Sequence, residues 1–179
     1  MSSEPAPVAE RLGKVIAGYQ ASVDDFDRET ARLMGVNETD LRCLEILMEE
    51  VPEAAPSLLA ARLGLTTGSV TAMLDRLEKL GYLTRSPHPS DRRKTIVRAT
   101  EAATRRGYEL IGPLLDEGRR ELLTRYSVEQ IELITEFLER TTNIQKRHVA
   151  RLRALPTPAR NRADSRRTRV SDQPDDLAG

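Results

Sequence analysis

The apolar residues in the first third of the chain recur at the three- and four-residue steps of an α-helix. From Val8 to Leu33 this spacing predicts one long amphipathic helix over about 8–34, which Gly35 and Asn37 end. Thr39 is the expected N-terminal cap of a second helix. The apolar face of that second helix carries Leu41, Leu44, Leu47 and Met48. This part of the chain is therefore expected to be helical, after a disordered N-terminus over 1–7.

The next apolar segment predicts two shorter helices close together. After a loop over 51–55, Pro56 suits the first turn of a helix over 57–63, which stops at Gly64. A tight turn over 65–68 follows, and Thr66 or Thr67 caps a further helix that Gly81 stops. The inward positions of this further helix are Val70, Leu74, Leu77 and Leu80. A helix, a four-residue turn and a second helix form the helix-turn-helix layout.

The pattern then changes from helical spacing to alternation. Residues 82–85 read as a short strand, and residues 94–99 alternate as a second strand. Between them, residues 86–91 contain Pro87 and Pro89, which exclude a helix and predict a loop. Two strands joined by a basic loop would form a wing beside the helix-turn-helix.

Helical spacing returns after the wing. Thr100 is expected to cap a long helix to about residue 125, in which Gly112-Pro113 should produce a kink or a break. Ser127-Val128-Glu129-Gln130 is a capping box that opens a last helix, ending near residue 152. Its predicted inward residues are Ile131, Ile134, Phe137, Leu138 and Ile144. Residues 153–179 are rich in Arg and poor in apolar residues, which predicts a disordered tail.

The distribution of charge adds a functional expectation. The 179 residues include 28 Lys and Arg and 28 Asp and Glu, so the net charge is zero. Residues 62–106 nevertheless hold ten basic and four acidic side chains, an excess of +6 that the remaining residues balance with −6. A basic segment in an otherwise acidic chain points to an anionic partner. An ordinary solvated surface is the alternative that charge alone leaves open.

Several features bear on the compartment. No stretch reaches the roughly 18 apolar residues that a membrane span needs, so no membrane partner is expected. The N-terminus lacks a basic segment followed by an apolar one, and we therefore expect no signal peptide. Cys43 is the single cysteine, which excludes an internal disulfide and a cysteine-rich zinc site. The expected location is cytoplasmic.

The sequence offers no catalytic or metal-binding constellation. His88 and His148 lie far apart in the chain, and neither has a carboxylate or cysteine at ligand spacing. The glycine-containing turn over 63–68 lacks the Lys of a phosphate-binding loop. Cys43 lies among leucines and is expected to be a core residue, with redox sensing as the alternative. We therefore expect no enzyme activity, no cofactor and no metal ion.

The second helix of a helix-turn-helix enters the major groove with its N-terminal residues nearest the bases. Short hydroxyl side chains at that end can bond phosphates or bases, and methyl groups can contact thymine. The residues at that end are Thr66, Thr67, Gly68, Ser69, Thr71 and Ala72. Gly68 would also let the backbone approach the sugar-phosphate. Arg76, further along, is expected to meet a phosphate or an internal carboxylate.

The predicted wing contributes the strongest local charge. Arg92, Arg93 and Lys94 follow Asp91 directly. An arginine at a loop tip can enter a narrow minor groove, and a second basic side chain can hold a phosphate. Asp91 would repel phosphate, so we expect it to clamp an arginine in position. Together with the helix-turn-helix, the wing predicts double-stranded DNA as the partner, and a solvated charged turn is the alternative.

Three sequence blocks, taken together with their spacing, make the chain resemble the MarR family of transcription regulators. The blocks are Leu59-Ala60-x-x-Leu63-Gly64-Leu65-Thr66-Thr67-Gly68-Ser69-Val70-Thr71, Leu74-Asp75-Arg76-Leu77-Glu78-x-x-Gly81-Tyr82-Leu83-x-Arg85 and Asp91-Arg92-Arg93-Lys94-x-x-Val97-x-Ala99-Thr100. Thr39-Asp40-Leu41-Arg42-x-Leu44 extends the match upstream, and the helical layout over about 8–150 also fits. Four residues depart from the common family pattern: Ala55 replaces a capping Thr or Ser, Leu58 a Glu, His88 an Asp and Ala99 a Leu.

The resemblance implies a mostly α-helical winged helix-turn-helix with a small β-wing. It implies one domain over 8–152, with a DNA-binding lobe at about 39–100 and dimerisation helices at about 8–34 and 101–152. It also implies a homodimer on a pseudo-palindromic operator, usually a repressor and often released by a small-molecule effector or an oxidant. The implied DNA contacts are Thr66, Thr67, Ser69, Thr71, Ala72, Arg76, Arg92 and Arg93. A winged-helix protein-interaction module with only non-specific DNA affinity is the alternative.

Overall fold

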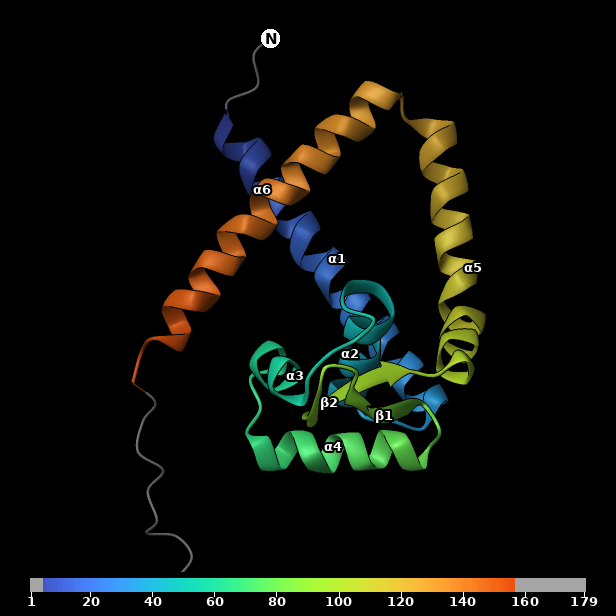
Figure 1. Ribbon diagram of the computed structural model, residues 1–179. Helices are drawn as coiled ribbons and strands as arrows, with labels where there is room; N and C mark the ends of the chain where they lie inside the picture. The colour runs from blue at the N-terminus through green and yellow to red at the C-terminus, as the bar shows by residue number, and fades with distance from the viewer. Residues whose placement is uncertain (1–4, 157–179) are drawn as a thin grey trace, which may run out of the picture. The chain divides into compact units, whose positions relative to one another are not determined.

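The computed structural model describes residues 5–156 (Figure 1). Residues 1–4 and 157–179, which include most of the predicted disordered tail, lie outside the described residues. The chain divides into two compact units, Met1–Glu121 and Leu122–Gly179. The elements are, in order, α1 (Pro5–Met34), α2 (Glu38–Glu45), the π-helical turn η1 (Ile46–Glu50), α3 (Pro56–Leu63), α4 (Thr67–Lys79), β1 (Leu83–His88), β2 (Asp91–Ala99), α5 (Glu101–Arg125) and α6 (Val128–Arg153). The predicted fold class, mostly helical with a small β-wing, is confirmed.

The boundaries of the first two helices differ from those predicted. Helix α1 begins at Pro5, so residues 5–7 are helical rather than disordered, and it ends before Gly35, whose φ is +70°. Asn37, not Thr39, caps α2, because its extended backbone brings the side-chain oxygen within 2.8 Å of the Asp40 amide. Thr39 lies inside the first turn. The prediction of a Thr39 cap is therefore wrong by two residues.

The core of the first unit lies between the helices of the helix-turn-helix and the wing. Residues that are fully buried come from α2, α3, α4 and both strands: Leu41, Leu44, Leu59, Val70, Leu74, Leu77, Leu83 and Val97. Leu80, predicted to face inward, is 49% exposed, because it caps the end of α4 where Gly81 turns the chain with a φ of +75°. Met73 is buried in that face instead. Burial of this leucine-rich face holds α4 in place and leaves its opposite side free.

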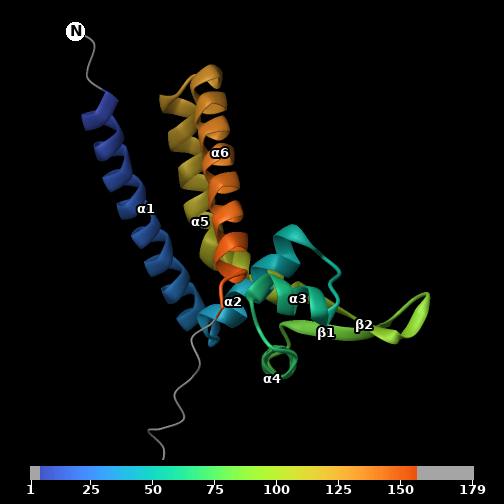
Figure 2. The same cartoon turned by 90° about the vertical axis from the view of Figure 1, so that its left-hand side faces the viewer.

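The wing is longer and more regular than predicted. Strand β1 runs through Pro87 to His88 and pairs with β2 in antiparallel order, with a register irregularity at Pro87/His88. The predicted loop over residues 86–91 is therefore too long: the turn is confined to residues 89–90, and residues 86–88 and 91 belong to the strands. A two-stranded ribbon has an unpaired edge on each strand, so a proline can occupy a position where its missing N–H is not needed. Figure 2 shows the ribbon extending away from the helices that carry it.

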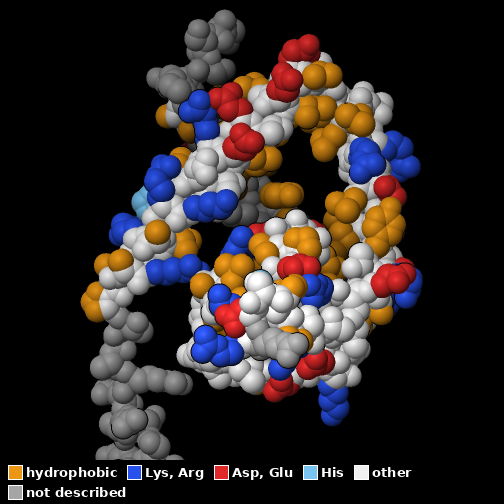
Figure 3. Space-filling view, viewed as in Figure 1, with side chains coloured by type: hydrophobic (Ala, Val, Ile, Leu, Met, Phe, Trp, Pro, Cys, Tyr) orange, Lys and Arg blue, Asp and Glu red, His pale blue; other side chains and the backbone are white. Residues whose placement is uncertain are grey.

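Helix α5 begins as predicted and, at Gly112-Pro113 where the sequence predicts a kink or a break, it continues without a break. The Thr100 hydroxyl accepts a hydrogen bond from the Ala103 amide at 3.2 Å, which caps the helix. Pro113 lies inside a helix assigned without interruption over Glu101–Arg125. Apolar side chains nevertheless remain exposed along α5 (Figure 3): Tyr108, Leu114, Leu115, Leu122 and Leu123.

Helix α6 forms where the sequence places it, but its apolar face is not buried. Ser127 and Gln130 form both hydrogen bonds of the predicted capping box. No described residue of α6 is buried, and Phe137 is 37% and Leu138 53% exposed, so the predicted inward orientation is wrong within one chain. A lone helix has no second layer in its own unit against which to pack. None of the described helices combines the length and apolarity needed to cross a membrane.

Candidate nucleic-acid interface

The first turn of α4 presents hydroxyl groups that are exposed but internally bonded. Thr66 caps the helix, because its Oγ1 accepts from the Ser69 amide at 3.3 Å and lies 2.9 Å from the Ser69 Oγ. Thr71 donates its hydroxyl hydrogen to the carbonyl of Thr67 at 3.0 Å. These bonds fix rotamers while leaving oxygen lone pairs available to a partner. Of the two caps that the sequence allows, Thr66 and Thr67, the structure uses Thr66.

Gly68 lies in this turn with nothing packed against it. A Cβ built at Gly68 would meet no atom within 4 Å, and its φ is not in the left-handed region. The fold of the free chain therefore does not require glycine here. The missing side chain of Gly68 would matter only for the close approach of a binding partner to the backbone of this turn.

The basic end of the wing is the most exposed charge at this site. The side chain of Arg93 is 95% exposed, and that of Lys94 is 70% exposed. Asp91 lies 3.8 Å from both cationic groups and accepts a hydrogen bond from the Arg93 amide at 3.1 Å. Asp91 therefore organises the backbone more firmly than it holds either side chain. Arg92 lies between Asp91 and Arg93 at the start of β2, rather than in a loop.

A groove joins the wing to the first turn of α4. It has a volume of about 590 Å³ and brings together four of the predicted site residues, Thr67, Thr71, Arg93 and Lys94. The start of α3 forms its remaining wall through Pro56 and neighbouring residues. Hydroxyl groups and cations from two separate elements therefore face one cavity.

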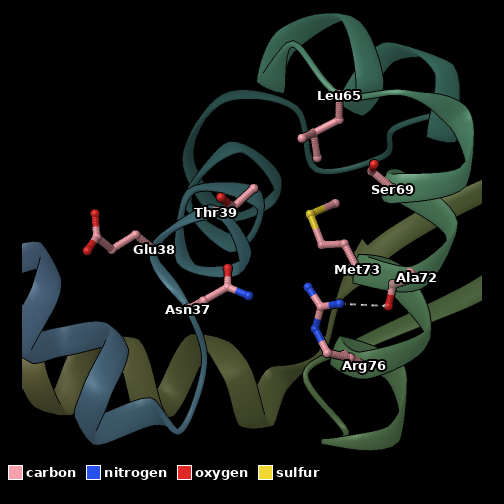
Figure 4. Close-up of a pocket in the computed structure, with 8 residues that line it drawn as sticks. All are labelled: Asn37, Glu38, Thr39, Leu65, Ser69, Ala72, Met73 and Arg76. Atoms are coloured by element: carbon pink, nitrogen blue, oxygen red, sulfur yellow. Dashed lines mark hydrogen bonds between the residues drawn. The ribbon is translucent and has the colours of Figure 1, made fainter. Parts of the chain in front are cut away.

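A second hollow lies on the other side of α4 (Figure 4). Its volume is about 600 Å³, and Ser69, Ala72 and Arg76 line it together with residues of the α2 N-terminus. The two cavities share no predicted site residue. The structure therefore distributes the predicted residues over two faces of α4, with the exposed ridge of the helix between them.

Arg76 is bonded to an internal carboxylate, one of its two predicted partners. Its Nη2 and Nε donate to the two carboxylate oxygens of Asp40 at 2.7 and 3.3 Å. This hydrogen bonding, with the carboxylate charge, raises the pKa of Arg76. The sequence does not identify Asp40 as the partner, because 36 positions separate the two residues.

Ion pairs also change the charge picture of the basic segment. Acids outside residues 62–106 bind four of its arginines, in the pairs Arg62–Glu50, Arg76–Asp40, Arg98–Glu53 and Arg106–Glu109. Within the segment, Asp75 binds Arg85 at 2.6 Å and so ties β1 to α4. Much of the excess of +6 is thus neutralised at close range, and the wing cations retain the longest ion-pair distances.

Among the described residues, the other groups that could carry chemistry are the Cys43 thiol and the His, Asp and Glu side chains. Cys43 is fully buried, and burial followed by the charge of Asp40 raises the pKa of its thiol to about 12, as a core residue requires. Over residues 5–156, no group of three or more His, Cys, Asp or Glu side chains has a metal-binding arrangement. His88 accepts a hydrogen bond from the Ser90 amide at 3.2 Å in the wing turn.

Comparisons with known proteins identify the same fold and family. The model of the MarR family matches residues 36–95. An uncharacterized HTH-type transcriptional regulator of Bacillus subtilis, YcgE, is 37% identical over 128 residues, which are 72% of this chain and 82% of that protein.

Two solved structures show the shared architecture. A MarR family protein of Bacillus stearothermophilus is 19% identical with a TM-score of 0.62, over 80% of this chain and 99% of that one. The transcriptional regulator BldR of Sulfolobus solfataricus is 26% identical with a TM-score of 0.51, over 81% and 99% of the two chains. With its winged helix-turn-helix and the matching blocks in α3, α4 and the wing, the chain belongs to the MarR family of DNA-binding transcription regulators.

Proposed function

We propose that this protein is a ligand-responsive repressor that binds a pseudo-palindromic DNA operator as a homodimer. The observation that carries the proposal is the groove shared by the first turn of α4 and the basic end of the wing. A helix of this kind enters a major groove, while an adjacent wing reaches the backbone or the minor groove. Hydroxyl groups at such a junction can hydrogen-bond base edges or phosphates, and cations can pair with phosphates.

The proposed contacts divide according to what they can recognise. Thr66, Thr67, Ser69, Thr71 and Ala72 would meet base edges or the adjoining phosphates. The basic residues Arg92, Arg93 and Lys94 would supply phosphate or minor-groove contacts. Gly68 would allow the sugar-phosphate to approach the helix. No Arg, Asn or Gln stands in the first turn of α4, so single base contacts would be weak and specificity would come from several together.

The proposed homodimer follows from apolar surface that one chain leaves uncovered. Tyr19 of α1, Leu123 of α5 and Leu133 of α6 are each about two-thirds exposed. Similar apolar residues follow at helical spacing on all three helices. A second copy would bury these stripes and place two copies of α4 about one helical turn apart on DNA. Action on the chromosome also agrees with the cytoplasmic location expected from the sequence.

The proposed response to a ligand is supported by space next to α4. Open surface hollows of about 600 and 590 Å³ lie on the two sides of this helix, and a small molecule can occupy a space of this volume. A ligand in either cavity would contact residues that are proposed to face DNA. Binding of such a ligand would compete with DNA for the same surface.

Selection of bound duplexes from a random DNA pool tests this proposal. We expect one enriched, near-symmetric sequence, bound far more tightly than a scrambled duplex of equal length at about 0.15 M salt. Candidate small molecules would then be screened for release of the selected duplex. If binding is weak, sequence-independent and abolished by moderate salt, the proposal is wrong and the protein-interaction module is favoured.

A further inference from the structure

We infer that Arg76 is a positioning residue, which sets the recognition helix against α2 through its ion pair with Asp40 instead of contacting a phosphate. The inference rests on the proposed DNA-binding function and concerns the site that carries it. It also departs from the DNA-contact role that the family resemblance implies for Arg76.

All three guanidinium nitrogens of Arg76 have partners within the chain. Nη2 and Nε donate to Asp40, while Nη1 donates to the carbonyl oxygen of Ala72 at 3.4 Å. Figure 4 shows the guanidinium turned from α4 toward the α2 N-terminus, with the bond to Ala72 as a dashed line. A phosphate contact would have to share this group with an internal carboxylate.

The burial of the two partners is strongly unequal. The side chain of Asp40 is only 3% exposed, whereas that of Arg76 is 51% exposed. A buried carboxylate without a partner is costly, so Asp40 holds the guanidinium more strongly than an exposed acid would. The fork of Arg fits both carboxylate oxygens at once, which fixes orientation as well as distance. The pair therefore constrains where α4 lies relative to Asp40.

The location of the pair gives this constraint a consequence for DNA recognition. In the part of the chain that the structure describes, no other side-chain hydrogen bond joins α2 to α4. The hollow of about 600 Å³ lies beside the pair, so the pair borders open space on that side. Ser69 and Ala72, proposed to face DNA, line the same hollow. Loss of the pair would let this face of α4 shift.

The two roles predict opposite effects of neutralising Asp40. If Arg76 contacts a phosphate, Asp40→Asn frees the guanidinium and removes a nearby negative charge, so DNA binding tightens. If Arg76 positions α4, the same substitution loosens the helix and weakens binding. A phosphate contact also contributes about 0.9 per subunit to the slope of log Kd against log salt concentration, whereas a positioning residue contributes nothing.

The experiment measures anisotropy of the selected duplex with full-length protein over a range of salt concentrations. Variants D40N, R76Q and D40N/R76Q are compared with wild type, and R93Q serves as a salt-slope control. We expect D40N and R76Q each to weaken specific binding about tenfold with an unchanged salt slope. The double variant should be no weaker than the worse single variant, because both substitutions remove one interaction. Tighter or unchanged binding by D40N, or a reduced slope for R76Q, overturns the inference.

A second variant keeps the inference testable if D40N does not fold, as judged by thermal unfolding. R76K retains the positive charge but cannot form the two-pronged pair. We expect R76K to lose specific affinity, and wild-type affinity in R76K overturns the positioning role. If wild type itself prefers no duplex, the proposed function fails, which is a separate result from failure of this inference.

Discussion

The wing cation Arg93 offers a quantitative test of the DNA-binding surface. Its side chain is 95% exposed, and its nearest acidic group, on Asp91, is 3.8 Å away. Replacement by Gln therefore removes a charge without breaking a close internal contact. We expect the fold and the thermal stability of R93Q to match those of wild type within about 0.5 kcal/mol.

The expected loss of DNA affinity can be estimated from this geometry. One charge-assisted contact at an exposed position is worth about 1 kcal/mol per subunit. Each phosphate that is no longer neutralised lowers the salt slope by about 0.9, and two subunits lower it by about 1.8. Between roughly 50 and 200 mM salt, binding by R93Q should consequently weaken about twelvefold less than binding by wild type.

Fluorescence anisotropy at several salt concentrations measures both quantities on one duplex. The control is R140Q on α6, which removes an exposed positive charge outside the helix-turn-helix and wing, where Arg140 pairs with Glu136 at 2.6 Å. R140Q should leave affinity and slope unchanged. An unchanged slope in R93Q, or equal losses in both variants, would refute a phosphate contact by the wing.

Three further predictions concern stability and reactivity. Ala55 occupies the cap position of α3 without a side-chain bond, so A55S should raise the unfolding free energy by about 0.5–1 kcal/mol and Tm by about 1–4 °C at fixed protein concentration; no gain over wild type contradicts this. Cys43 is buried and its thiol pKa is about 12, so iodoacetamide near neutral pH should label the unfolded chain but not the native one, and prompt native labelling is the opposing result. Burial raises the pKa of Glu50, but hydrogen bonds and charges from Arg62 and Arg42 outweigh it, and the pKa is lowered from 4.5. The ionised Glu50 therefore stabilises the fold at pH values above 4.5. This stabilisation is lost as the pH falls through the lowered pKa of the folded state. E50Q should therefore show a flatter acid-side stability profile by urea titration, and identical profiles contradict the assignment.

Local sequence signals predicted much of the fold because the structure uses them locally. Gly64 and Gly81 end helices with φ values of +67° and +75°, and the Ser127–Gln130 capping box forms both of its bonds. Leu74 and Leu77 are buried as their spacing requires. Each of these features is set by neighbours a few positions away, which a periodic pattern can capture.

Two predictions about the wing and α6 differ from the structure for another physical reason. Pro87 and Pro89 exclude a helix, as the sequence predicts, but Pro87 lies in a strand instead of a loop, because a two-stranded ribbon leaves one side of each strand unpaired and tolerates it. The apolar face of α6 was expected to be inward, but a face can be apolar for a partner that is not in the same chain.

The candidate site was predictable in its residue types but not in its pairing. Thr67 and Thr71 of α4 line one groove with the wing cations Arg93 and Lys94, whereas Ser69 and Ala72 line the hollow on the other side of α4. The role of Arg76 could not be assigned, because its partner Asp40 lies 36 positions earlier and is recognised only once α2 packs beside α4. Pairs formed by tertiary packing carry no local signature.

The most direct test of the account is a hydroxyl-radical footprint of the purified protein on its selected duplex. A homodimer with two copies of α4 in successive major grooves predicts two symmetric protected regions, whose centres lie about one helical turn apart. Flanking minor-groove protection should weaken selectively in R93Q. A single asymmetric region, or protection that does not depend on sequence, would contradict the account.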